Sequence, residues 1–203
     1  MNDRCLLFTG DSFVTGAGDA AGLGWVGRLV AASWEDGLPM TAYNLGVRGE
    51  SMPEVARRFR AEAEPRVIPE ADNRLVVAAG ANDVSLLPDG SQEVSTEDSL
   101  SALGSLLDDA EALGMATLVI GPGPAGIADH DERSRELGER FRELAEERGA
   151  RYLPVLDDLL GSEPWRRTAR ENDGIHPGAE GYAAYAELVI GGGFLDWLRE
   201  PRG

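Results

Sequence analysis

The hydrophobic positions of this chain alternate between short β-rich runs and longer segments with the spacing of amphipathic helices. Five short apolar runs predict strands at residues 5–9, 41–45, 74–79, 117–121 and 151–154. Strands that alternate with helices indicate a mainly parallel sheet, covered on both faces, that binds ligands beyond the carboxyl ends of its strands. We therefore expect an α/β fold, and the length of 203 residues favours a single domain, 1–203.

Helix signals stand between the predicted strands. Ser51 and Glu54 form a capping-box pattern, and Ser95 opens a segment that Gly114 closes at the position where helices often end. Trp25 and Trp34 are interpreted as residues that pack a helix onto the core. We expect helices over residues 25–33, from Ser51, from Ser95 to about Leu113, along the apolar stripe Leu137, Phe141 and Leu144, and from about Ala179.

The balance of charge narrows the range of partners. Acidic residues outnumber basic ones 36 to 19, and the net charge of −17 repels nucleic acid and anionic membrane surfaces. The single cysteine, Cys5, lies in an apolar run and is expected to be a buried thiol. No segment has the length of a signal-peptide core or a membrane span, so the sequence predicts a cytoplasmic protein without membrane insertion.

Four segments carry residues suited to chemistry, and the first three directly follow predicted strands. Ser12 is a candidate nucleophile, but a hydroxyl needs a neighbouring base and a group that orients the base. His176 and Asp173 are the candidates, because one turn can present both side chains to the same space. Backbone N–H groups of Ser12 and Gly46 and the amide of Asn82 could stabilise an oxyanion. The segments are Gly10-Asp11-Ser12, Asn44-Leu45-Gly46, Gly80-Ala81-Asn82-Asp83 and Asp173-Gly174-Ile175-His176.

Together these segments resemble the SGNH or GDSL-type hydrolases, whose Ser, Gly, Asn and His residues occur here in the family's order over almost the whole chain. The resemblance implies a three-layer α/β/α sandwich with a five-stranded parallel sheet. It also implies hydrolysis of esters or thioesters through an acyl-enzyme, without a metal or other cofactor. Phe13 stands where the family name has Leu, and we expect its ring to pack behind the nucleophile.

By position, the resemblance assigns Ser12 as nucleophile and first oxyanion donor, Gly46 and Asn82 as further donors, and His176 as base with Asp173 behind it. Each of these residues also has a purely structural interpretation. Ser12 could cap a helix, Gly46 could serve a turn, and Asn82 could satisfy loop backbone groups.

The remaining polar residues near the motifs receive supporting roles or none. Asp11 and Asp83 are expected to organise their loops through hydrogen bonds. His130 stands among acidic residues at a predicted helix start, where we expect an exposed, solvated side chain. The loops 84–94 and 121–130 are expected to form the walls of the substrate pocket, with room for small or medium acyl groups.

Three other functions remain open at this stage. A metal-dependent phosphoesterase would need several imidazole ligands, and the chain has two histidines. A non-catalytic binding domain could retain the fold. An acyltransferase would use the same residues as a hydrolase. The leading expectation is a serine ester hydrolase that acts on a small-molecule ester; its oligomeric state is not predicted.

Overall fold

The computed structural model describes residues 3–201, and its centre is a five-stranded sheet with the strand order β2-β1-β3-β4-β5. Every neighbouring pair of these strands is parallel, as the sequence predicted. The strands are β1 (Arg4–Gly10), β2 (Thr41–Gly46), β3 (Asp72–Ala78), β4 (Ala116–Ile120) and β5 (Arg151–Leu153).

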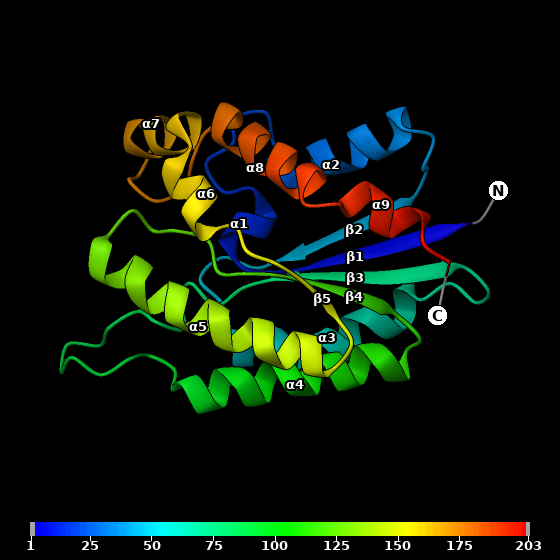
Figure 1. Cartoon of the computed structure of the whole chain (residues 1–203), viewed down its shortest axis with the longest axis horizontal. Helices are drawn as coiled ribbons and strands as arrows, with labels where there is room; N and C mark the ends of the chain where they lie inside the picture. The colour runs from blue at the N-terminus through cyan, green and yellow to red at the C-terminus, as the bar shows by residue number, and fades with distance from the viewer. Residues whose placement is uncertain (1–2, 202–203) are drawn as a thin grey trace.

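Helices cover both faces of the sheet, which gives the expected three-layer α/β/α sandwich (Figure 1). One layer contains α3 (Met52–Ala63), α4 (Thr96–Ala112) and α5 (Ala128–Glu147). The opposite layer contains α1 (Ser12–Thr15), α2 (Gly24–Glu35), α6 (Leu156–Gly161), α7 (Glu163–Glu171), α8 (Ala179–Gly191) and α9 (Phe194–Arg199). A short 3-10 turn, η1 (Glu64–Arg66), follows α3.

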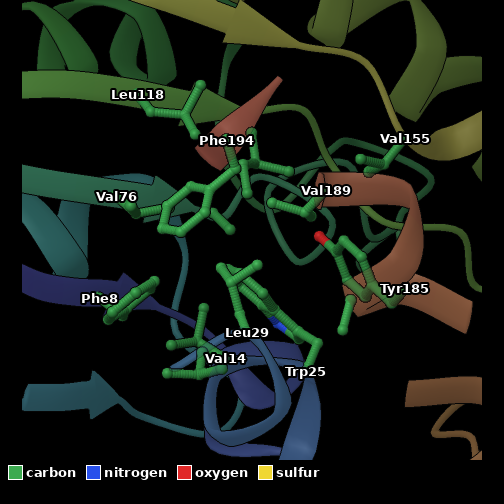
Figure 2. Close-up of a cluster of buried hydrophobic side chains, with 14 of the residues drawn as sticks. Phe8, Val14, Trp25, Leu29, Val76, Leu118, Val155, Tyr185, Val189 and Phe194 are labelled. Carbon is green, nitrogen blue, oxygen red and sulfur yellow. The ribbon is translucent and has the colours of Figure 1, made fainter. Parts of the chain in front are cut away.

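The sheet buries a separate hydrophobic core on each face. Alternate residues of β1 face opposite sides, so Leu6 and Phe8 belong to one core and Cys5 and Leu7 to the other. Figure 2 shows the first core, in which the ring of Trp25 stacks on Tyr185 with 5.0 Å between ring centroids. Both cores are fixed to the same strands, so they hold the strand ends in a rigid frame.

The strand order creates one place where a ligand site is favoured. The chain leaves β1 for β2 on one side of it and later returns to β3 on the other side, so the connections from β1 and β3 diverge. A crevice opens beyond the carboxyl ends of parallel strands at such a switch point. Gly10 at the end of β1 is paired in register with Gly46 of β2 and with Ala78 of β3, so the three strands end at the same level.

All the predicted strands and helices are present, with bounds that differ by a few residues. The capping box at Ser51 and Glu54, the cap at Ser95 and the buried Cys5 are confirmed. The helices α1, α6, α7 and α9 were not predicted; α1, α6 and α9, with 4, 6 and 6 residues, are too brief to show a helical repeat.

One prediction about the core was wrong. Trp25 is fully buried, as expected, but Trp34 lies on the outer face of α2 and is 58% exposed. Within residues 3–201, no helix is both long and apolar enough to cross a membrane.

Candidate active site

Ser12 stands at the sheet's carboxyl edge because β1 ends at Gly10 and α1 begins immediately afterwards. Asp11 caps this short helix: its side chain accepts a hydrogen bond of 2.9 Å from the backbone N–H of Phe13. The backbone N–H of Ser12 lies in the first turn of α1, where such groups have no acceptor within the helix. The local fold therefore presents both the hydroxyl and a free backbone donor of one residue.

His176 lies within hydrogen-bond distance of Ser12 although 164 residues separate them in the chain. Its Nε2 atom is 2.8 Å from the Ser12 Oγ atom, and its Nδ1 atom is 2.6 Å from Asp173 Oδ2. The structure thus brings together the predicted nucleophile, base and orienting carboxylate in one hydrogen-bonded chain. In this geometry Asp173 favours the tautomer with a proton on Nδ1, which leaves Nε2 free to accept the proton of Ser12.

The turn before α8 holds Asp173 and His176 in place. Oδ1 of Asp173 accepts hydrogen bonds from the backbone N–H groups of Ile175 and His176, at 3.0 and 2.8 Å. Partial burial acts to raise the pKa of Asp173, but these bonds and the imidazole hold it well below its usual range. The ring of Phe13 packs beside that of His176 at 5.6 Å between centroids, so it supports the base.

A cavity of about 410 Å³ opens over Ser12 and His176. The predicted wall loops contribute to it in part, through Ser85 from the first and through Ala125, Ile127 and His130 from the second. Its other lining residues follow the ends of β1, β2 and β3 or precede α8: Asp11, Ser12, Phe13, Arg48, Gly49, Ala81, Asn82, Ile175 and His176. The lining combines apolar side chains with a few polar groups, as is typical of small-molecule sites.

Asn82 lines this cavity from the loop after β3. Its Nδ2 atom donates a hydrogen bond of 2.9 Å to the carbonyl of Glu50, which leaves the second amide hydrogen for another acceptor. The same loop is fixed on both sides. Asp83 accepts hydrogen bonds from the backbone of Met52 and the hydroxyl of Ser99, and the Arg133 side chain of α5 donates to the carbonyl of Val84.

The structure places Gly46 outside the cavity, contrary to the sequence interpretation of its N–H as an oxyanion donor. That N–H donates to Oδ1 of Asn44 at 3.0 Å. Gly46 is needed for a different reason, because a Cβ atom there would lie 2.6 Å from the Thr15 nitrogen and 2.9 Å from the Asp11 carbonyl oxygen. Gly49, which the sequence analysis did not single out, lines the cavity instead.

His130 is also placed differently from the expectation of an exposed side chain. Only 13% of its side chain is exposed, and its imidazole lines the cavity near Ala81. Burial lowers its pKa, against the opposing effect of the Asp131 carboxylate, so the neutral form is favoured. The acidic neighbours in the sequence suggested solvent, but the first turn of α5 directs this residue inward.

Asp11 is a buried carboxyl group on the same cavity. Burial raises its pKa to about 7, and the nearby charge of Asp83 acts in the same direction, while the hydrogen bond from Phe13 opposes them. The proton on Asp11 at low pH therefore stabilises the folded state. Because the folded pKa lies above that of an exposed aspartate, this stabilisation is complete below about pH 4 and is lost as the pH rises through 7.

The Asp11→Asn variant, which retains an acceptor but cannot ionise, should gain stability relative to wild type as the pH rises from about 4 to about 7. The gain should be at most about 1.4 kcal/mol per pH unit, the limit for one proton. Urea unfolding of both proteins at several pH values measures it. The same substitution at exposed Asp129 is the control, and equal pH profiles for the Asp11 variant and wild type would refute this assignment.

A doubly covered parallel sheet with a Ser–His–Asp arrangement at its carboxyl edge defines the class of the protein: a three-layer α/β/α fold with a serine-centred site. The family model described as GDSL-like lipase/acylhydrolase matches residues 8–184. The chain belongs to this family and is a carboxylic ester hydrolase.

Solved structures show the same fold at low sequence identity. The acetylxylan esterase Axe2 from Geobacillus stearothermophilus superposes with a TM-score of 0.73 at 18% identity, over 93% of each chain. LAE5, an alpha/beta hydrolase from the metagenome of Lake Arreo, Spain, gives a TM-score of 0.76 at 20% identity, over 94% of this chain and 95% of its own. No curated protein sequence matches the chain.

Proposed function

We propose that this chain, as a single catalytic domain, hydrolyses carboxylic esters of small to medium acyl groups through a covalent acyl-enzyme on Ser12. The observation that carries the proposal is the hydrogen-bonded chain from Ser12 Oγ through His176 to Asp173, which opens on a cavity of about 410 Å³. The family match favours ester hydrolysis over the phosphoesterase, acyltransferase and non-catalytic alternatives.

The proposed reaction follows from this geometry. Nε2 of His176 accepts the hydroxyl proton as Ser12 Oγ attacks the ester carbonyl carbon, and the carbonyl oxygen becomes an oxyanion. The imidazolium then donates this proton to the leaving alcohol as the ester C–O bond breaks. A water molecule, deprotonated by His176, attacks the acyl-enzyme in the same manner and releases the acid and free Ser12. Asp173 stabilises the imidazolium in both halves.

We propose three donors for the oxyanion: the backbone N–H of Ser12, the free amide hydrogen of Asn82 and the backbone N–H of Gly49. Gly49 replaces Gly46 in this role because it lines the cavity and the N–H of Gly46 is bonded to Asn44. Gly49 has a φ of +80°, a conformation that favours glycine and turns its backbone differently from that of an extended strand.

The size of the cavity favours short esters. A volume of about 410 Å³ lies at the lower end of the range for small-molecule sites. The fold is shared with an acetylxylan esterase, so acetyl esters of polyols are one substrate class to include in a screen. Thioesters remain chemically accessible to the same nucleophile.

The test is hydrolysis of p-nitrophenyl acetate, butyrate and octanoate by the purified protein in the presence of a chelator. Steady turnover, with an initial burst of p-nitrophenol where deacylation is slow, is the expected result. Turnover of none of these esters would contradict the proposed function.

In the same assay, the Asn82→Ala variant should lose about 100- to 1,000-fold in kcat, the usual cost of removing one oxyanion donor. KM should change little, because the lost hydrogen bond forms with the transition state rather than with the bound ester. The loss of the Asn82–Glu50 bond can also loosen the loop, so thermal unfolding is measured in parallel. A loss below about tenfold in a folded variant would remove Asn82 from the oxyanion site.

A further inference from the structure

Arg48 is held at the edge of the cavity by a fixed backbone turn. The N–H of Val47 donates to the carbonyl of Gly10 at 2.9 Å, and the N–H of Glu50 donates back to the carbonyl of Val47 at 3.4 Å. Arg48 and Gly49 are the two central residues of this turn, and the positive φ of Gly49 is typical of its third position. The turn fixes the backbone of Arg48, an exposed residue that lines the cavity.

The charge of Arg48 is not neutralised by the protein. Most arginines of this acidic chain pair with Asp or Glu, and nearby Arg58 contacts both Glu50 and Glu62 at 2.6 Å. Within residues 3–201, Arg48 forms no ion pair, although acidic residues outnumber basic ones 36 to 19 in the sequence. A guanidinium group is a planar, permanently charged donor that suits carboxylates in particular.

Two other ionisable groups on the cavity carry less charge than they would in water. Burial raises the pKa of Asp11 to about 7, and burial lowers the pKa of His130. Two exposed apolar residues, Ile127 and Ile175, also line the cavity, together with polar residues such as Asn82 and Ser85. A ligand in the cavity therefore meets apolar side chains and, on the side of β2, an arginine.

We propose that Arg48 binds a carboxylate carried by the ester substrate, so that the enzyme prefers anionic esters with an apolar body over neutral ones. This inference rests on the proposed ester hydrolysis at Ser12. The net charge of −17 repels anions from the protein as a whole, which makes a local cation necessary for binding such a substrate. The carboxylate can belong to the acyl group or to the alcohol, and the experiment separates these two cases.

The test compares two matched pairs of esters. In the acyl pair, mono-p-nitrophenyl adipate carries a carboxylate that p-nitrophenyl hexanoate lacks. In the alcohol pair, 4-acetoxybenzoate carries a carboxylate that its methyl ester lacks. For each pair, the ratio of kcat/KM for the anionic ester to kcat/KM for the neutral ester is measured in wild type, Arg48→Met, Arg48→Lys and Arg170→Met. Differences in intrinsic reactivity cancel when one ratio is compared between proteins.

In at least one pair, Arg48→Met should lower this ratio about tenfold, mainly through KM, and Arg48→Lys should lower it less. The pair that responds identifies the side of the ester that carries the carboxylate. In wild type, 1 M salt should reduce the same ratio by screening. Arg170→Met is the control, because Arg170 is exposed on α7, does not line the cavity and carries the same charge.

The proposal would be overturned if the ratios of kcat/KM in Arg48→Met equalled those of wild type in both pairs. It would also be overturned if Arg170→Met lowered the ratio as much as Arg48→Met does. Hydrolysis of the neutral esters that depends on Ser12 would leave the proposed function intact in either case. Absence of turnover for all four esters would instead contradict the proposed function and the role of Arg48 with it.

Discussion

The Ser12→Ala variant should lose ester turnover almost completely, by about 10⁵- to 10⁶-fold in kcat, the scale seen when a serine nucleophile is removed. Nε2 of His176 is hydrogen-bonded to Ser12 Oγ at 2.8 Å, so the substitution removes the hydroxyl on which the base acts. The substitution removes one atom from a mostly buried side chain at the start of α1 and leaves the cap from Asp11 intact. The fold should therefore persist, and unfolding temperature and circular dichroism check this.

His176→Ala should cost about as much as Ser12→Ala, and the double variant should be no worse than either single one. The two residues act as one unit, because the proton that leaves Ser12 goes to His176. The readout is hydrolysis of p-nitrophenyl acetate, together with mass spectrometry of the acylated protein. More than a tenth of wild-type turnover in the folded Ser12→Ala variant would sink the nucleophile assignment, and additive losses would show that the two residues act separately.

The fold was predictable because its strands are short and apolar and alternate with helices, two of which, α3 and α4, begin at clear capping residues. Parallel sheets bury both faces of their strands, so β1 and β3 appear in the sequence as continuous hydrophobic runs. The position of the site followed from the same pattern, since polar residues after three of these runs must meet at one edge. The turn that carries Asp173 and His176 does not follow a strand; its contact with Ser12 was expected from the spacing of three residues between acid and base and from the resemblance to the SGNH family.

The errors concern residues whose neighbours in space differ from their neighbours in sequence. Trp34 has a large apolar side chain of the kind that usually lies in a core, but it lies on the outer face of α2. His130 has acidic neighbours along the chain, yet the first turn of α5 packs its imidazole toward Ala81. The face of the helix on which each residue lies decides whether it is buried. A short, polar first turn has too few apolar residues for the sequence to indicate which face points inward.

The choice between Gly46 and Gly49 shows a second limit. Two glycines within four residues give the same signal in the sequence, although they serve different purposes. Gly46 permits close approach of α1 to β2, whereas Gly49 supplies the positive φ of the turn beside the cavity. A positive φ and a close backbone contact are both reasons for glycine, and only the three-dimensional placement distinguishes them.

Asp173→Asn should reduce kcat by about 10³- to 10⁴-fold, because it reverses the hydrogen-bond direction at the base. Asp173 Oδ1 accepts two backbone N–H groups, so the single oxygen of asparagine is retained there and its NH₂ group faces Nδ1 of His176. Nδ1 must then act as an acceptor, which places the imidazole proton on Nε2. That tautomer cannot take the proton of Ser12.

The size of this effect distinguishes an orienting role from simple turn stabilisation. The Asp173 side chain is 47% exposed, so water can partly compensate for its lost charge, which places the expected effect at or below the 10⁴-fold of a buried triad aspartate. Glu171→Gln is the matched control, because it removes one nearby carboxylate without touching His176. If kcat of a folded Asp173→Asn variant stays within about tenfold of wild type while Glu171→Gln is unaffected, Asp173 only shapes the turn before α8, and His176 keeps its tautomer by other means.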